Sequence, residues 1–270
     1  MNICFIGGGN MASALIGGLL GKGYEAAQIS VVEIAAEGRA RLEREFAVRA
    51  VEGLAEGVTG SDIVVLAVKP QQLHEVATAL GPLISGQLIV SIAAGIRACD
   101  LARWLGSELV VRAMPNTPAL IRSGMTGVYA LPVVSQAQRE QAQAVLAAVG
   151  DTLWLQDEKM LDAVTAISGS GPAYVFYFIE ALQRAAMEMG FTADEARRLS
   201  VSTFLGGSLL AAASSEEVSL LRERVTSKNG TTERALKIMA EHQVAGHIVQ
   251  AAHAAAARSR ELGDELGQVG

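Results

Sequence analysis

The feature that most constrains the fold of this chain is a short apolar segment that leads directly into three consecutive glycines. Residues 3–6 are Ile, Cys, Phe and Ile, and Gly7, Gly9 and Ala12 follow with the spacing Gly-x-Gly-x-x-Ala. This order predicts a buried strand, a tight turn and a helix whose amino terminus faces an anion. The chain is therefore expected to begin as a Rossmann-type unit that binds a dinucleotide.

Further strands are predicted where Val, Ile and Leu cluster between segments with helical spacing. They comprise residues 3–6, 29–33, 63–68, 88–92, 109–112 and 127–130. Alternation of strands and helices is typical of a parallel sheet covered by helices on both faces. We predict an α/β fold with a doubly wound, mainly parallel sheet, and an NAD(P)-binding Rossmann domain over residues 1–157.

After Asp157 only helical patterns remain, and residues 158–270 are predicted to form an all-α domain. Its helices are expected to break at residues 168–172, 190–192, 214–215 and 227–230 and at Gly246. The stretches 174–189, 197–213 and 246–260 are apolar around most of their circumference, more than a single two-layer packing could hide. An intertwined homodimer is the expected remedy.

Composition excludes several classes of partner. The net charge is −6, and the absence of a Lys/Arg cluster argues against nucleic acid. Cys4 and Cys99 lack the spacing of a metal site or a disulfide framework. No apolar run approaches the ~20 residues that a membrane helix needs. We expect a cytoplasmic protein without metal, membrane or nucleic acid.

The acid Glu33, about twenty residues beyond the glycine turn, supports dinucleotide binding over a ligand-free turn. At the end of the second strand its carboxylate would bind the ribose hydroxyls of NADH and repel the 2′-phosphate of NADPH; the alternative is a solvated strand end. Arg39 and Arg41 could pair with a 2′-phosphate or lie on an exposed helix face.

Three more motifs follow predicted strands: Leu-Ala-Val-Lys-Pro at residues 66–70, Ser-Ile-Ala-Ala-Gly at 91–95 and Arg-Ala-Met-Pro-Asn-Thr-Pro at 112–118. Each alone could be a plain strand exit. Because parallel strands end at one edge of a sheet, the three loops are expected to share a site with the glycine turn.

The helical half carries two polar motifs. Ser-Gly-Ser-Gly-Pro at residues 168–172 predicts a glycine loop entering a helix, which capping alone could explain. Residues 226–233 read Thr-Ser-Lys-Asn-Gly-Thr-Thr-Glu, a loop suited to hold a carboxylate at a helix amino terminus. The alternative for this loop is a simple N-cap by Thr231 or Thr232.

In this order and spacing the six motifs resemble those of pyrroline-5-carboxylate reductases, over most of the chain. The resemblance implies reduction of Δ1-pyrroline-5-carboxylate to L-proline, the last step of proline biosynthesis, with NADPH, or NADH as the alternative. It implies a homodimer, often assembled into rings. The cofactor residues it implies are Ile6, Gly7, Gly8, Gly9, Asn10, Met11, Glu33, Ala67, Val68, Lys69, Pro70, Ala93, Ala94, Gly95 and Asn116. The substrate residues are Ser227, Gly230, Thr231 and Thr232, of which Thr232 is the catalytic hydroxyl.

Two departures accompany the resemblance. The family loop commonly reads Ser-Pro-Gly-Gly-Thr-Thr, whereas this chain has Lys228 and Asn229 after Ser227, which bears on the loop conformation. Glu33 would oppose the 2′-phosphate of the cofactor that many family members prefer.

Two rival functions are weighed. A β-hydroxyacid dehydrogenase shares the glycine turn but needs a catalytic lysine on the helix after its second glycine loop, and no lysine lies between Lys159 and Lys228. A non-catalytic NAD(P) sensor would need the turn alone, and the substrate loops argue against it.

Overall fold

The computed structural model describes residues 1–267, which divide into two compact units. The first unit consists of two segments, residues 1–170 and the end of the chain from Ala255. The second unit consists of residues 171–254. The sequence-based boundary at Asp157 lies earlier, because residues 158–170 pack against the sheet of the first unit through Val164, which lies over Gly127. Each unit is described by itself.

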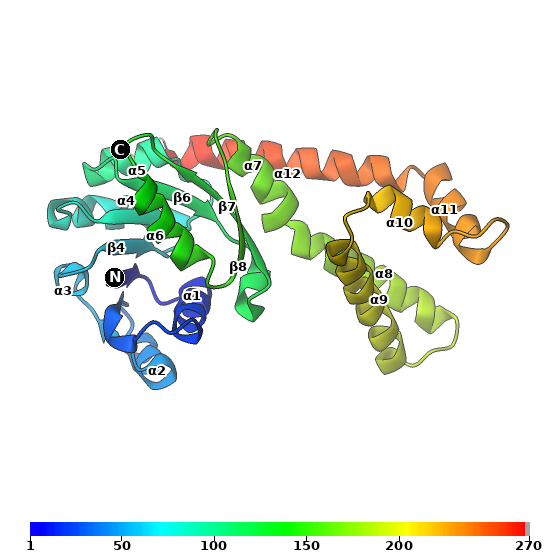
Figure 1. The fold of residues 1–270 in the computed structure, drawn as a ribbon, viewed down its shortest axis with the longest axis horizontal. Coiled ribbons are helices and arrows are strands. Elements are labelled where there is room, and N and C mark those ends of the chain that lie inside the picture. Colours follow the sequence, from blue (N-terminus) through cyan, green and yellow to red (C-terminus); the bar gives the residue numbers. More distant parts are fainter. Residues whose placement is uncertain (268–270) are drawn as a thin grey trace. The chain divides into compact units, whose positions relative to one another are not determined.

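The first unit is built on an eight-stranded sheet with the order β3-β2-β1-β4-β5-β6-β7-β8 (Figure 1). Strands β1 to β6 are parallel, whereas β7 is antiparallel to β6 and β8 is parallel to β7. The strands are β1 (Ile3–Ile6), β2 (Ile29–Val32), β3 (Arg49–Val51), β4 (Ile63–Leu66), β5 (Leu88–Ser91), β6 (Val110–Met114), β7 (Gly124–Ala130) and β8 (Gly150–Trp154). The predicted doubly wound, mainly parallel sheet is confirmed.

Helices cover both faces of this sheet. They are α1 (Asn10–Gly21), α2 (Ala36–Phe46), α3 (Leu54–Val58), α4 (Pro70–Leu80), α5 (Ala98–Leu105), α6 (Gln136–Leu146) and α7 (Met160–Val164), with short 3-10 turns at Ala26–Gln28, Gly81–Leu83 and Thr117–Ile121. Alternate residues of β1 serve the two cores: Ile3 and Phe5 pack with α1, α2 and α6, whereas Cys4 and Ile6 pack with α3, α4 and α5. Apolar residues on both faces explain why the central strands read as continuous apolar runs.

Two strands were missed by the sequence pattern. Strand β3 has only three residues and includes the exposed Arg49. In β8, Gly150, Asp151 and Thr152 precede the apolar pair Leu153 and Trp154, so no apolar run marks the strand. Both are edge strands with one or both faces partly open to solvent, so their side chains need not be uniformly apolar.

The second unit is all-helical, as predicted. It contains α8 (Gly171–Glu188), α9 (Ala193–Ala213), α10 (Val218–Arg224), α11 (Thr231–Glu241) and the beginning of α12 (Val244–Gly267). Helices α8 and α9 pack together as an antiparallel pair, and the turn between them contains Gly190, which has a positive φ. The predicted break at Gly246 is wrong: the chain turns at Gln243, which has a positive φ of 50°, and Gly246 lies inside α12.

Large apolar side chains remain exposed in the second unit. Phe176 and Tyr177 on α8 are 60% and 73% exposed, and Leu205 and Leu210 on α9 are 59% and 69% exposed. No residue of α8 or α11 is fully buried. A surface of this kind on one chain indicates an interface with another polypeptide.

In the described part of the chain, residues 1–267, no helix combines the length and apolarity needed to span a bilayer.

Candidate active site

The glycine turn has the geometry of a pyrophosphate cradle. Gly7 has a φ of +99°, and a Cβ there would lie 2.8 Å from the carbonyl oxygen of Ala67, so only glycine fits. Gly9 has nothing within 4 Å of a Cβ position and is the N-cap of α1, with no side chain capping the helix. The first turn of α1 contains no acid. Its amino terminus is therefore open to an anionic ligand.

Glu33 does not extend into solvent as a free strand end. One carboxylate oxygen accepts a hydrogen bond of 3.0 Å from the Gly8 N–H, and the other accepts one of 2.9 Å from the Ala35 N–H. The side chain also packs so close to Gly38 that a Cβ there would be 2.8 Å from its Cγ. An anion is thus fixed beside the glycine turn, at the carboxyl end of β2.

The two arginines that could meet a 2′-phosphate are already engaged. Arg39 donates to the carbonyl oxygens of Glu33 and Ile34 and pairs with Glu52 at 3.0 Å. Arg41 donates to the Gly8 carbonyl oxygen at 2.6 Å and to Ser13 Oγ, and it pairs with Glu45. Arg41 therefore stabilises the glycine turn itself, through a contact across 33 residues that no local sequence pattern predicts.

The loops after β4 and β5 lie at the same edge of the sheet as the turn. Ala67 N–H donates to the Ile6 carbonyl oxygen at 2.8 Å, which joins the exits of β1 and β4. Lys69 is exposed and is the N-cap of α4, with Pro70 in the first turn. Ile92 N–H donates to the Leu66 carbonyl oxygen, and Gly95 has a φ of +80°. The predicted cofactor segments at residues 6–11, 67–70 and 93–95 thus meet at one edge.

Asn116 differs from this group because its side chain is used within the protein. Its Nδ2 donates to the carbonyl oxygen and the Oγ of Ser168, at 3.2 and 3.0 Å, and its Oδ1 accepts from the Met125 N–H at 2.9 Å. The amide therefore connects the loop after β6 to residues 165–169. It has no free side-chain donor left for the role predicted for Asn116 at the cofactor site.

The Ser-Gly-Ser-Gly motif is a compact junction between helices and not an extended loop: Ser168 and Gly169 end a π-helical turn, Ser170 is a bend and Gly171 begins α8. Residues Thr165–Gly169 form a π-helical turn closed by a 2.8 Å hydrogen bond from Ser170 N–H to the Thr165 carbonyl oxygen. Gly169 serves close packing, since a Cβ there would lie 2.9 Å from Cε of Met114. Small residues here allow contact with the loop after β6, and π-helical turns of this kind are frequent at functional sites.

The loop before α11, in the second unit, presents unpaired backbone donors. Gly230 is the N-cap and no side chain caps the helix, so the simple N-cap reading of Thr231 and Thr232 is wrong. The Gly230 N–H closes a turn on the Ser227 carbonyl oxygen at 3.0 Å. In the described chain, residues 231–233 make no backbone N–H hydrogen bond of this kind. Thr232 is half-buried, and its hydroxyl does not cap the helix.

The loop with the Lys228–Asn229 departure has a left-handed residue at its tip. Asn229 has a φ of +60°, a conformation that asparagine adopts more readily than most residues. Its N–H donates to the Glu233 carboxylate at 2.7 Å. A Cβ at Gly230 would collide with Ser227 Oγ, so glycine is required at the second of the two positions only.

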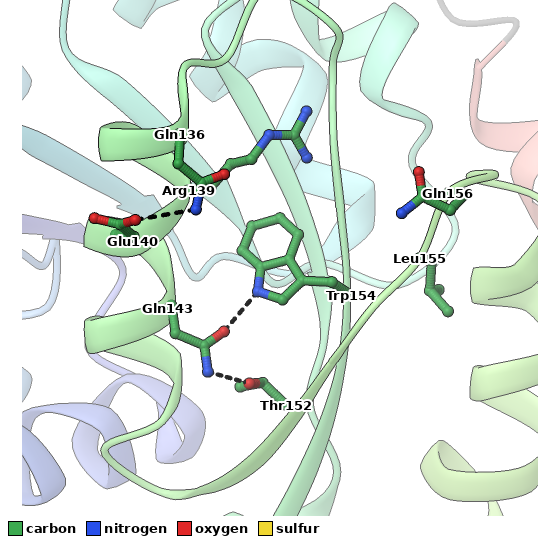
Figure 2. A pocket seen from close by; sticks show the side chains of 8 residues that line it. All are labelled: Gln136, Arg139, Glu140, Gln143, Thr152, Trp154, Leu155 and Gln156. Carbon is green, nitrogen blue, oxygen red and sulfur yellow. Dashed lines mark hydrogen bonds between the residues drawn. The ribbon is translucent and has the colours of Figure 1, made fainter.

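The cavity in Figure 2 lies elsewhere in the first unit. It measures about 520 Å³ and lies between α6 and the edge strand β8, which is separated from β1 by four strands. Its polar side chains pair with one another: Trp154 Nε1 donates to Gln143 at 2.6 Å, and Arg139 lies 5.6 Å from the Trp154 ring centroid. None of its lining residues belongs to the predicted cofactor segments. The lining residues are Gln136, Arg139, Glu140, Gln143, Thr152, Trp154, Leu155 and Gln156.

The cysteines add no chemistry to these sites. Cys4 is buried in β1, and burial raises the pKa of its thiol to about 11. Cys99 is exposed and free. Among residues 1–267, no three His, Cys, Asp or Glu side chains gather as a metal site would need.

Comparison with known proteins decides the family. Residues 158–262 match the family model for pyrroline-5-carboxylate reductase dimerisation, and residues 2–95 match that for NADP oxidoreductase, coenzyme F420-dependent. A pyrroline-5-carboxylate reductase of Pseudomonas aeruginosa is 51% identical over 98% of both chains. The chain belongs to the pyrroline-5-carboxylate reductase family.

Two solved structures of family members extend the comparison to the fold. The pyrroline-5-carboxylate reductase of Coxiella burnetii is 38% identical with a TM-score of 0.92, covering 97% of this chain and 98% of its own. The Plasmodium falciparum enzyme, solved with NADP bound, is 27% identical with a TM-score of 0.87 over the same shares. The family resemblance read from the six motifs is therefore confirmed.

Proposed function

We propose that this chain reduces Δ1-pyrroline-5-carboxylate to L-proline by hydride transfer from NADPH. The observation that carries the proposal is the 51% identity with a pyrroline-5-carboxylate reductase over nearly the whole of both chains. Because the match includes both the glycine turn and the loop before α11, it covers cofactor and substrate segments alike. NADPH is placed first because the Plasmodium falciparum relative was solved with NADP.

The glycine turn fits the pyrophosphate of this cofactor. The space at Gly9 and the uncapped amino terminus of α1 leave backbone N–H groups for the anion. The segments Ile6–Met11, 67–70 and 93–95 would line the remainder of the cofactor, with Glu33 at the adenosine ribose. When bound, the reduced nicotinamide supplies the hydride for the imine carbon.

The loop before α11 is proposed to hold the substrate. Its carboxylate would be bound by the N–H groups of Thr231 and its neighbours at the positive end of the helix. The Gly230 N–H is not available for the substrate carboxylate, because it already closes the turn on the Ser227 carbonyl oxygen. Thr232 would accept a hydrogen bond from the protonated ring nitrogen, the form in which the imine carbon is most electrophilic. Ser227 shapes the turn below the carboxylate.

The second unit is proposed to form the homodimer. Residues 158–262 match a dimerisation model, and the exposed Phe176, Tyr177, Leu205 and Leu210 need a covering surface. A second copy of the chain would bury them. Assembly of dimers into rings and a cytoplasmic location stay predictions.

An assay with purified protein tests the proposed reaction. We expect loss of NADPH absorbance when pyrroline-5-carboxylate is added, with proline as the product. A β-hydroxyacid with NAD is the control and should give no turnover. Oxidation of that hydroxyacid would support the rival dehydrogenase, and nucleotide binding without turnover of either substrate would support the sensor.

Glu33 is expected to limit the use of NADPH relative to NADH. Its carboxylate is held by the Gly8 and Ala35 N–H groups, and it would face the 2′-phosphate at close range. At about 4 Å in water, repulsion of one charge costs about 1 kcal/mol. Glu33→Gln should therefore raise the ratio of kcat/KM for NADPH over NADH about five-fold. Steady-state kinetics with both cofactors measure this ratio.

The matched control for Glu33 is Glu37→Gln, which removes an exposed acid from the first turn of α2. Its cofactor ratio should equal that of the parent. Equal losses with both cofactors in Glu33→Gln would mean that Glu33 only stabilises the turn.

A further inference from the structure

The loop that follows β5 is covered by the end of the last helix. Gly95 is buried, and a Cβ built there would lie 3.2 Å from Cδ1 of Leu266 and 3.7 Å from Cβ of Leu262. Gly95 also has a φ of +80°, a left-handed conformation that other residues rarely adopt. The shape of the Ala93–Gly95 loop is therefore bounded on one side by α12.

The contact is a close approach of backbone to backbone. Ser259 and Gly263, one turn apart, are the two buried residues of α12, so they define the face that packs. A Cβ at Gly263 would lie 3.1 Å from the carbonyl oxygen of Gly95 and 3.7 Å from Nε of Arg97. A methyl group at position 263 would be in tighter than ordinary contact with the loop backbone, and a larger side chain would have to displace that backbone.

Polar contacts fix this part of α12 on either side of Gly263. Asp264 pairs with Arg97, the N-cap of α5, and this hydrogen bond raises the pKa of the guanidinium. Ser259 Oγ donates to Asp162 at 2.7 Å, and the Gly267 carbonyl oxygen accepts from Arg103 at 3.1 Å. The surface ion pair contributes little free energy alone, but it adds a directed contact between α12 and the exit of the loop.

We propose that Gly263 and Asp264 are positioning residues for the cofactor: they hold the Ala93–Gly95 loop in its binding conformation by keeping α12 packed against it. The proposal rests on the proposed function, in which this loop lines the cofactor. Gly263 admits α12 close enough to cover Gly95, and Asp264 holds Arg97 at the exit of the loop. Gly263 faces the Gly95 backbone and Asp264 pairs with Arg97, so both would act on the cofactor through the loop.

A graded substitution series tests this role. The dissociation constant of NADPH is measured by nicotinamide fluorescence, with kcat and both KM values from steady-state kinetics. Gly263→Ala places its methyl group at the tight but tolerable distance and should raise the NADPH dissociation constant less than three-fold. Gly263→Val should raise it about five- to ten-fold, while the KM for pyrroline-5-carboxylate and the kcat at saturating NADPH stay within two-fold.

Glu261→Val is the matched control, because it places the same β-branched residue on the same helix at an exposed site whose partner is Arg258. Its NADPH affinity should equal that of the parent. If Gly263→Val does not fold, Gly263→Ala combined with Asp264→Ala carries the same test, with an expected three- to five-fold loss of NADPH affinity.

Three outcomes would overturn the proposal. One is a Gly263→Val variant with lower thermal stability and unchanged NADPH affinity, which would make the contact purely structural. Another is an equal rise in the KM values of both substrates, which would indicate general loosening. The third is an unchanged dissociation constant in the double variant. A parent protein that binds no NADPH would instead refute the proposed function.

Discussion

Thr232→Ala is expected to lower kcat/KM by roughly ten- to a hundred-fold. The hydroxyl lies at the second position of α11, half-buried and not used to cap the helix, so it is free to meet a ligand. A hydrogen bond to a charged group contributes about 1.5–3 kcal/mol, and loss of a contact made to the cationic ring nitrogen in the transition state would appear in kcat. Steady-state kinetics at saturating NADPH measure the change.

Thr232→Ser provides the matched comparison because it keeps the hydroxyl and removes only a methyl group. It should retain most of the activity, whereas the alanine variant should not. Full activity in Thr232→Ala, with an unchanged KM for pyrroline-5-carboxylate, would remove Thr232 from the mechanism and leave the family assignment intact.

Arg112→Met is expected to cost about 3 kcal/mol of unfolding free energy. The Arg112 side chain is 6% exposed and pairs through Nη1 with Glu158 at 2.9 Å. The same Glu158 oxygen accepts the Ala98 N–H at 2.7 Å, at the start of α5. Methionine would leave the Glu158 carboxylate, which is 20% exposed, without its counter-charge, and breaking a buried pair on one side typically costs about 3–5 kcal/mol. We take the lower end because Glu158 is partly solvated.

Urea unfolding at one fixed protein concentration measures this loss, since the stability of a dimer depends on concentration. Arg103→Met is the matched control: Arg103 is 55% exposed in its pair with Asp100 and should cost less than about 1 kcal/mol. Adding Glu158→Gln to Arg112→Met should recover part of the loss by removing the unpaired charge. A loss below about 1 kcal/mol in Arg112→Met alone would show that the pair does not stabilise the fold.

The central sheet could be predicted because its strands are buried on both faces. Residues 3–6 are all apolar and were predicted with the bounds observed for β1. The short edge strands β3 and β8 lack this burial, so no apolar run marks them. An apolar pattern indicates that the faces of a strand are buried, and edge strands are the least buried strands of a sheet.

The glycines were harder to interpret from sequence, because a glycine can serve a turn or a close contact. Gly7 was correctly assigned to a tight turn, and its φ is +99°. The sequence predicts Gly169 in a loop, whereas it lies in a π-helical turn and packs closely against the end of the Met114 side chain. The difference depends on a residue 55 positions away, which local sequence patterns do not report.

The candidate site was predicted at the level of segments and not of side-chain contacts. The strand-end motifs meet at one edge because parallel strands must end there. In contrast, the hydrogen bond from Arg41 to Gly8 and the packing of Gly263 on Gly95 join residues far apart in sequence. No periodicity or motif encodes such contacts. Assignment of the individual site residues stays a prediction for the kinetic experiments above.

The first unit is discontinuous in the chain, and this has a consequence for its biosynthesis. Residues 255–267 belong to it together with residues 1–170. A ribosome therefore translates the whole intervening helical unit before it supplies the segment that covers Gly95. Nascent chains should hold an incompletely packed dinucleotide fold for that interval, with the surface beneath α12 open to chaperones.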